Sequence, residues 1–322
     1  MFIDISNVWS IIKGGEGSGH YGHSSSSREG TKGGGSDPGG EGSGKNVLSE
    51  TKVVEGKLVT TNEKDLPGHI QKIRIPPAWT GVVFNPDPEG DLLVKGFDSK
   101  RRLQAIYSER YMTRQAKAKF ARVMNLNKNL GEVKKEVGLD LKNKNFKIAE
   151  LAACTRLIME TGIRAGSGME TGGDVKAYGA SILEGRHIIK EGSNVRLKFV
   201  GKKGVSQDIL VSNTDVVLDL LNRKKIAGNK NMIFDVGYME LLNYVKNKGR
   251  GGFLIKDLRT LNGTTEAVKA MENVEKPKTM KQYKKAVRTV AKVVAEKLGN
   301  TPTIALQSYI NPSIFTAWRG KF

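Results

Sequence analysis

The chain is poor in the features that mark secreted, membrane-bound or cofactor-dependent proteins. Its 322 residues include one cysteine, Cys154, so one copy cannot form an internal disulfide. No apolar run approaches the roughly 18 residues of a membrane span, and residues 1–12 lack the basic start and long apolar stretch of a secretory signal. These absences predict a protein of a reducing, cytoplasmic compartment with no membrane contact.

Motifs for nucleotides and metals are missing as well. The sequence contains no P-loop of the form G-x-x-x-x-G-K-[S/T], and no His, Cys or acidic cluster has the spacing of metal ligands. We therefore expect no metal, no ATP and no other cofactor.

Acidic side chains are scarce relative to basic ones. There are 33 Asp and Glu against 53 Lys and Arg, which gives a net charge of +20. Residues 1–46 contain four basic and five acidic side chains, so the rest of the chain has a net charge of +21. A basic excess on the folded part favours a polyanionic partner, most often nucleic acid. Charge alone also fits a basic protein with no such partner.

Composition divides the chain into three parts. Residues 14–45 are mostly Gly, Ser and charged residues, a composition that buries too little apolar surface to offset the entropy of ordering. We predict a disordered leader and linker over residues 1–46 and a β-rich domain over residues 47–113. Its strands are expected around Val82–Phe84, Leu92–Val94 and Gln104–Tyr107.

Helical patterns dominate residues 114–322. Phe146–Thr161 reads as an apolar helix capped by Gly162, and Gln282–Leu298 has the apolar spacing of an amphipathic helix. Residues 195–200 and 206–211 read as a β-hairpin within this helical domain. The predicted fold class is α+β, with a small β-rich lobe before a mainly helical domain that contains a small sheet.

Four side chains of this helical domain form a set suited to phosphodiester chemistry. They are Arg164 in T-G-I-R, Lys202 in F-V-G-K, Arg259 in I-K-D-L-R-T and Tyr309 in S-Y-I-N-P. A tyrosine can attack phosphorus, two arginines match the charge of the phosphorane, and a lysine can protonate the leaving oxygen. Each residue alone would more often be a surface charge or a packing residue, so the hypothesis depends on the ordered set.

These motifs resemble the type IB DNA topoisomerases, in particular the small enzymes of poxviruses and bacteria. The resemblance covers roughly residues 67–318 and begins with I-R-I-P-P-A-W at 73–79. It implies that Tyr309 is the nucleophile, Arg164 and Arg259 clamp the scissile phosphate, and Lys202 is the general acid. A fifth family position, often histidine in viral members and asparagine in bacterial ones, is Asn300 here; its amide can still donate to a phosphate oxygen.

The resemblance implies a transient nick through a 3′-phosphotyrosine, strand rotation and resealing without ATP. It further implies double-stranded DNA as partner, a monomer that clamps the duplex, and a catalytic domain of the tyrosine recombinase and topoisomerase IB type. The glycine-rich linker resembles stretches of bacteriophage proteins, so a phage or bacterial source is expected. One departure is the glycine-rich, slightly acidic stretch at residues 165–174, which affects the expected DNA contacts rather than the chemistry.

Further DNA contacts are predicted on both folded parts of the chain. Basic and polar side chains on the β-rich lobe, at the start of the helical domain and beside the catalytic residues are the candidates: Lys95, Lys100, Arg101, Arg102, Gln104, Tyr107, Arg114, Lys117, Lys203 and Lys256. A solvated charged turn is the alternative for residues 100–102.

Three other functions remain open from the sequence. A tyrosine recombinase or integrase shares the catalytic set, but usually has histidine where this chain has Lys256, and a helical rather than β-rich N-terminal module. A catalytically inactive DNA-binding relative is the second alternative, and a structural phage protein is the third.

Overall fold

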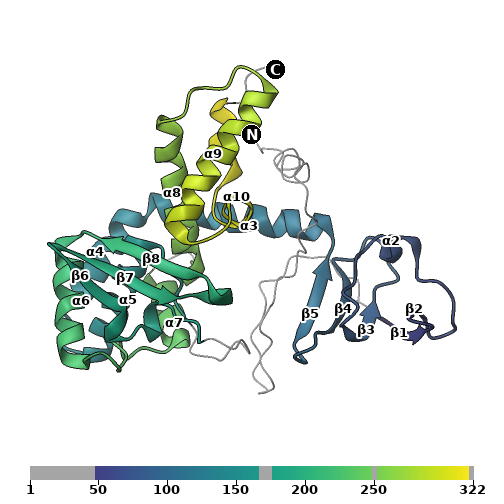
Figure 1. Ribbon diagram of the computed structural model, residues 1–322, viewed down its shortest axis with the longest axis horizontal. Helices are drawn as coiled ribbons and strands as arrows, with labels where there is room; N and C mark the ends of the chain where they lie inside the picture. The colour runs from purple at the N-terminus through teal and green to yellow at the C-terminus, as the bar shows by residue number, and fades with distance from the viewer. Residues whose placement is uncertain (1–47, 167–175, 249–251, 319–322) are drawn as a thin grey trace. The chain divides into compact units, whose positions relative to one another are not determined.

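The computed structural model describes residues 48–166, 176–248 and 252–318 (Figure 1). The predicted leader, most of the glycine-rich stretch after Arg164 and the last four residues lie outside this described part. The described chain divides into two compact units, one ending at Lys117 and the other starting at Ala118. The predicted α+β class is confirmed, because an antiparallel sheet precedes a mainly helical region with a small sheet.

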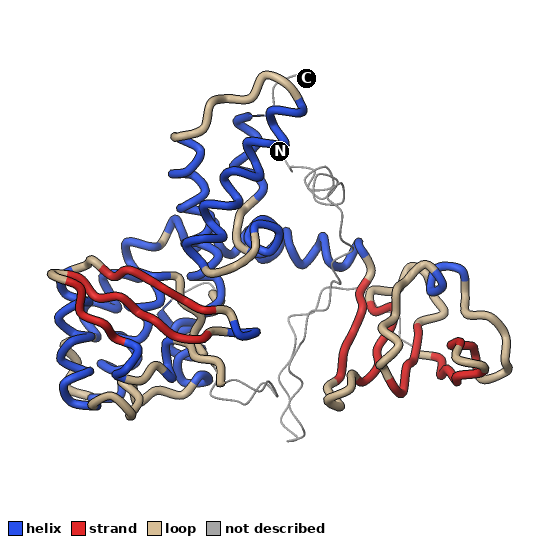
Figure 2. Tube along the Cα trace, in the orientation of Figure 1, coloured by secondary structure: helices blue, strands red, loops and turns tan. Residues whose placement is uncertain are grey.

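The first unit is a five-stranded antiparallel sheet with a short helix. Its strands are ordered β2-β1-β3-β4-β5 (red in Figure 2). Side chains from β3, β4 and the α2 region form its core: Leu66, Ile70, Val82, Phe84 and Val94. The elements are β1 (Ser49–Val54), β2 (Lys57–Thr60), α2 (Gly68–Gln71), β3 (Thr80–Phe84), β4 (Leu92–Phe97) and β5 (Leu103–Tyr107).

Strands β3, β4 and β5 were predicted, and the turn between β3 and β4 is one of the local signals that made this possible. Asn85 Oδ1 accepts from the Asp87 backbone N–H at 3.0 Å, and Asn85 Nδ2 donates to Leu92 O at 3.0 Å. This side chain therefore closes the N-P-D-P-E-G turn from both sides. The following helix, α3 (Glu109–Lys128), begins five residues before the predicted start at Arg114.

The second unit combines helices with the three-stranded antiparallel sheet β6-β7-β8. The predicted hairpin and both predicted helices are confirmed as β7, β8, α5 and α9, each within about two residues. The elements are α4 (Leu130–Asp140), α5 (Phe146–Thr161), β6 (Ile188–Glu191), β7 (Asn194–Val200), β8 (Ser206–Val211), α6 (Thr214–Ala227), α7 (Tyr238–Lys248), α8 (Ile255–Glu272), α9 (Met280–Leu298) and α10 (Pro302–Ser308).

Two hydrophobic clusters build this second unit. One gathers the buried faces of α5, α6, α7 and the small sheet. The other gathers α9, α10 and residues 312–318. Helix α8 joins them, because Ile255, Leu258 and Leu261 near its start pack in the first cluster and Ala267 and Ala270 in the second. Side chains on the first turns of α8 therefore lie where the two clusters meet.

Candidate active site

Tyr309 lies at the end of the short helix α10. Thr301 caps this helix by accepting from the Ile304 backbone N–H, and Pro302 occupies its first turn, as the sequence predicted. Tyr309 is half-buried, and its phenol oxygen accepts a hydrogen bond from Arg164 Nη2 at 3.2 Å. The nucleophile candidate and the first arginine, 145 residues apart in sequence, are thus in direct contact.

Arg164 follows directly after helix α5. Gly162 ends this helix in the left-handed conformation, with φ of 68°, and so turns the chain toward Tyr309. The Arg164 carbonyl accepts from the Ala180 backbone N–H at 2.8 Å, which fixes its backbone. The Arg164 Nη2 that contacts the phenol also donates to Asn300 Oδ1 at 3.0 Å. Arg164 therefore joins the predicted fifth position to the predicted nucleophile.

Arg259 lies on the first turns of α8 and is 4% exposed. Its Nη1 donates to Gly162 O at 2.6 Å and its Nη2 to Leu298 O, so it ties the end of α5 to the end of α9. The guanidinium carbon lies 4.9 Å from the centre of the Tyr309 ring. The buried Nε has no hydrogen-bond partner among the described residues. A buried donor without a partner is costly, and an anion that accepts from it would remove that cost.

Charge and burial oppose each other at these groups. Burial disfavours ionisation of the Tyr309 phenol, but the nearby charges of Arg164 and Arg259 outweigh it and hold the pKa of Tyr309 below its usual value. Burial, with a contribution from Arg164, lowers the pKa of Arg259 to about 10, so this side chain stays cationic at neutral pH. The arrangement therefore favours a phenolate and an anionic ligand at the same place.

Lys202 lies in the tight turn between β7 and β8 and is exposed. With Arg164, Tyr178 and Gln207 it lines a small hollow on the surface of this unit. The structure thus brings the hairpin lysine and the first arginine to one place. Lys203 follows in the same turn, and its side chain lies outside the described part of the chain.

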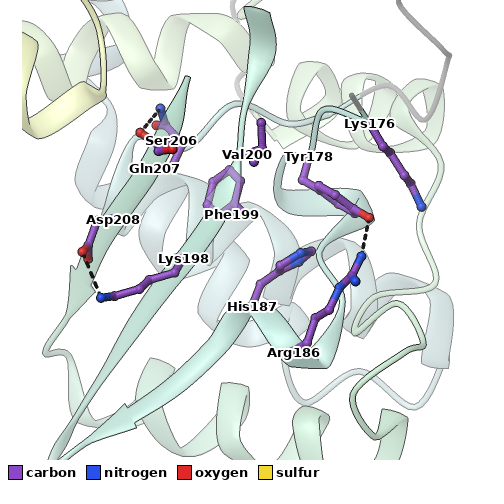
Figure 3. Close-up of a pocket in the computed structure, with 10 residues that line it drawn as sticks. All are labelled: Lys176, Tyr178, Arg186, His187, Lys198, Phe199, Val200, Ser206, Gln207 and Asp208. Atoms are coloured by element: carbon purple, nitrogen blue, oxygen red, sulfur yellow. Dashed lines mark hydrogen bonds and ion pairs between the residues drawn. The ribbon is translucent and has the colours of Figure 1, made fainter. Parts of the chain in front are cut away.

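A larger pocket adjoins this hollow, and Tyr178, Phe199 and Gln207 line both (Figure 3). Arg186 Nη2 donates to the Tyr178 phenol oxygen at 2.8 Å, and that phenol donates to Glu184 Oε1 at 3.0 Å. Burial lowers the pKa of His187, whose Nδ1 accepts from the Glu184 backbone N–H at 3.0 Å. Lys176 and Lys198 complete the cationic lining. This group was not predicted from the sequence, because no motif joins segment 176–187 to strands β7 and β8.

The backbone at Tyr309 is held by side chains that no sequence motif predicted. Lys119 Nζ on α3 donates to Ser308 O at 2.9 Å, and Thr264 Oγ1 on α8 donates to Tyr309 O at 3.1 Å. A Cβ at Gly263 would lie 2.8 Å from Tyr309 O, so only glycine allows α8 to approach this closely. These contacts span up to 189 residues of sequence, and no local pattern reports them.

Lys119 predicts a pH-dependent stability. Burial lowers its pKa to about 8, with Lys256 acting in the same direction, against about 10.4 in an unfolded chain. Between these values the unfolded chain holds a proton that the native protein has lost, so native stability rises with pH. We expect the unfolding free energy of wild type minus that of Lys119→Met to increase between about pH 7 and about pH 10, measured by urea unfolding. Lys142→Met, at an exposed position, should show no such trend, and an unchanged difference for Lys119→Met would contradict the assignment.

The side chains of the first unit that were predicted to contact DNA differ in their exposure and in their ion pairs. Arg102 pairs with Asp98 at 2.7 Å, Arg114 pairs with Asp91 at 2.5 Å, and Gln104 is buried with its amide on Asp98. Tyr107 stacks on Tyr111 at 4.6 Å. The remaining cations are exposed or half-exposed and form no ion pair with another described residue: Lys95, Lys100, Arg101 and Lys117. On the second unit, Lys256 is exposed on α8 beside the buried Arg259.

No helix among residues 48–166, 176–248 and 252–318 is both long and apolar enough to cross a bilayer.

Comparison with known proteins gives relatives over most of the chain. The family "Eukaryotic DNA topoisomerase I, catalytic core" matches residues 108–313. The "DNA topoisomerase 1B" of Acanthamoeba polyphaga mimivirus is 27% identical over 271 residues, which are 78% of this chain and 79% of the relative. The "DNA topoisomerase I" of Monkeypox virus is 27% identical over 288 residues, 83% of this chain and 89% of the relative. That of Rabbit fibroma virus, "DNA topoisomerase 1", is 24% identical over 275 residues, 80% and 85% respectively. These relatives are viral, whereas the sequence had suggested a phage or bacterial source.

Proposed function

The chain belongs to the type IB DNA topoisomerases, of the small kind found in poxviruses and mimivirus, and from this premise we propose that it relaxes supercoiled duplex DNA through a covalent bond to Tyr309. The observation that most supports this is the contact of Arg164 with both Asn300 and Tyr309. Three residues predicted from separate motifs thereby meet at one nitrogen of the Arg164 guanidinium group.

In the proposed cleavage step, the Tyr309 oxygen attacks a backbone phosphorus while its proton passes to solvent. The bond from phosphorus to the 5′ oxygen breaks, and Lys202 donates a proton to that oxygen. Arg164 and Asn300 stabilise the charge on the phosphorane, and the unpartnered Nε of Arg259 is available to do so. The products are a 3′-phosphotyrosine and a free 5′ hydroxyl.

Resealing is the reverse of these events. The 5′ hydroxyl attacks the phosphotyrosine, Lys202 accepts its proton, and Tyr309 leaves as the phenolate that two arginines stabilise. The covalent bond preserves the phosphodiester energy, so the proposed cycle needs neither ATP nor a metal ion. Rotation of the free end while the strand is open would release supercoils of either sign.

Asn300 gives a graded test of the phosphorane contacts. Its Nδ2 donates to Leu298 O at 3.2 Å, which leaves one amide hydrogen for a phosphate oxygen. We expect Asn300→Ala to slow single-turnover cleavage of a duplex on the order of tenfold, since one uncharged donor is lost. Asn300→His should recover much of this rate. A rate unchanged in Asn300→Ala would exclude the residue from the site.

The function as a whole is tested with plasmid DNA. We expect the protein to relax negatively and positively supercoiled plasmid in EDTA without ATP. Salt-sensitive DNA binding with neither relaxation nor a covalent adduct would indicate an inactive relative instead. A covalent adduct with little relaxation, together with joining at defined site pairs, would indicate a recombinase.

A further inference from the structure

The pocket beside the catalytic hollow has an aromatic wall. Tyr178 and His187 pack edge to face, with ring centres 4.3 Å apart, and the ring of Phe199 lies 6.1 Å from that of His187. All three side chains line the pocket (Figure 3), which we call the Tyr178 pocket. A flat ring of a ligand can stack on aromatic side chains placed in this way.

Hydrogen-bond donors surround this wall. Arg186 contacts Glu184 through Nε and the Tyr178 phenol through Nη2, while its Nη1 donates to no other described residue. The Nδ1 of His187 accepts from a backbone N–H, so the neutral ring carries its proton on Nε2. Lys176 adds an ammonium group to the lining. These donors suit a ligand group that only accepts, such as a phosphate.

One buried carboxylate holds three of the lining side chains in place. Glu184 is 7% exposed. Its oxygens accept from Lys176 Nζ at 3.1 Å and from the Tyr178 phenol at 3.0 Å, and lie 2.8 Å from Arg186 Nε. Side chains that are fixed before binding lose less entropy when a ligand arrives. The Tyr178 pocket is therefore organised in advance for a ligand.

The balance of charge at the pocket favours an anion. The lining contains three cations and one acid, Asp208, which is already matched by Arg196 at 2.9 Å and Lys198 at 3.4 Å. With the buried Glu184 included, three cations stand against two acids, a net charge of +1. An inorganic anion would leave the aromatic wall uncovered, and an apolar ligand would leave the donors unpaired. A nucleotide has both a flat ring and a phosphate.

The Tyr178 pocket lies beside the groups proposed to act on the leaving strand. Tyr178, Phe199 and Gln207 line both the pocket and the hollow that contains Arg164 and Lys202. Its volume is about 640 Å³, which is within the range of pockets that hold small ligands. A strand that ends at Lys202 therefore has its terminal nucleotide next to the pocket.

We propose that the Tyr178 pocket binds one unpaired nucleotide, with its base against the aromatic wall and its phosphate on Arg186 and Lys198. Two sources supply this chemistry. One is the first nucleotide of the cleaved strand, which carries the free 5′ hydroxyl; this source rests on the proposed function. The other is a free nucleotide, which would compete with the strand. A terminal base held here would keep the 5′ hydroxyl near Lys202 for resealing.

The first test examines the strand as the source. Nicked duplexes carry a 3′ phosphate and a 5′ hydroxyl at the nick, and the nucleotide with this hydroxyl is either mismatched or abasic, so no base pair has to open. Affinities are measured in a Tyr309→Phe background, so no chemistry is needed. We expect Tyr178→Ala to weaken binding of the mismatched duplex at least about fivefold, through lost stacking. Binding of the abasic duplex should change less than about twofold.

Matched variants separate the ring from the fold and the phosphate. Tyr178→Phe retains the ring and should bind both duplexes like the parent, whereas Tyr238→Ala removes an exposed ring on α7 and should affect neither. Arg186→Gln should weaken binding of both duplexes on the order of tenfold, because both carry the phosphate. Lys190→Gln, at an exposed position on β6, is its control.

The second test examines free nucleotides by equilibrium dialysis of thymidine 3′-phosphate against each protein. Tyr178→Ala should weaken its binding at least about fivefold, and should not alter binding of deoxyribose 3-phosphate, which lacks the base. A base-dependent effect with the duplex alone would identify the strand as the source, and one with thymidine 3′-phosphate alone would identify a free nucleotide.

The proposal is overturned if Tyr178→Ala has no base-dependent effect in either test. Equal losses with the mismatched and the abasic duplex, without an effect on thymidine 3′-phosphate, would be such a result. Neither test needs cleavage. A wild-type protein that forms no covalent adduct would reject the proposed function, and the two tests would still decide whether the Tyr178 pocket binds a nucleotide.

Discussion

Replacing Tyr309 with phenylalanine should abolish plasmid relaxation, with a loss of at least about 10⁴-fold, and should leave no denaturant-stable DNA adduct. The phenol oxygen is the proposed nucleophile, and no other group in the site can replace the bond it forms to phosphorus. The ring itself stays, so its contact with the Arg259 guanidinium at 4.9 Å should persist. The measurement is relaxation and adduct formation in parallel with DNA binding.

A matched control separates chemistry from packing. Tyr238→Phe removes the same oxygen from α7, where the side chain is 36% exposed, and should keep full activity. Tyr309→Phe should bind DNA within about threefold of wild type, because phosphate contacts dominate affinity. Residual adduct in Tyr309→Phe would show that another residue is the nucleophile.

The second large effect is expected at Arg259. Arg259→Lys keeps the charge but loses the planar fork, so one ammonium group cannot reach Gly162 O, Leu298 O and a phosphate together. We expect single-turnover cleavage at saturating DNA to fall about 10²- to 10³-fold. The unfolding free energy should fall by about 1–3 kcal/mol, since buried carbonyls lose donors.

A comparison with an exposed arginine distinguishes the two roles of Arg259. Arg196→Lys on β7 changes a surface ion-pair residue and should alter cleavage less than about threefold. If Arg259→Lys retained more than a third of the wild-type cleavage rate, the phosphate role would be rejected, and the residue would be structural only. The pH at which cleavage reaches half its maximum should rise in Arg259→Gln, because one of the two positive charges that lower the pKa of the Tyr309 phenol is then lost.

Much of the fold could be predicted because its signals are local. Helix α9 has a continuous apolar stripe and a glycine cap, and β7 and β8 alternate around a glycine-bounded turn. Strands β1 and β2 were not predicted individually, since Val59 is the one fully buried side chain of the two strands and their sequences show no clear apolar alternation. The start of α3 was placed too late, because Glu109 and Arg110 continue from a strand without a proline or glycine between them.

The candidate site also contains residues that local motifs predict and residues that only the fold brings together. Tyr309, Arg164, Arg259 and Lys202 are embedded in recognisable motifs, so the sequence identified them, and the structure places Arg164 and Arg259 against Tyr309. Lys119 donates to the Ser308 carbonyl, which is 189 residues away in sequence, and no sequence motif predicts this contact. The residues that line the Tyr178 pocket come from segments 176–187 and 198–208, and no sequence motif joins these segments.

The most direct test of the proposed mechanism is the identity of the protein–DNA bond. The protein is incubated with a short duplex in EDTA, denatured, digested with protease, and the nucleotide-bearing peptide is sequenced by mass spectrometry. The mechanism predicts one peptide, with a 3′ phosphate on Tyr309 and a free 5′ hydroxyl on the partner fragment. A phosphate on another residue, or a 5′-phosphate linkage, would contradict it.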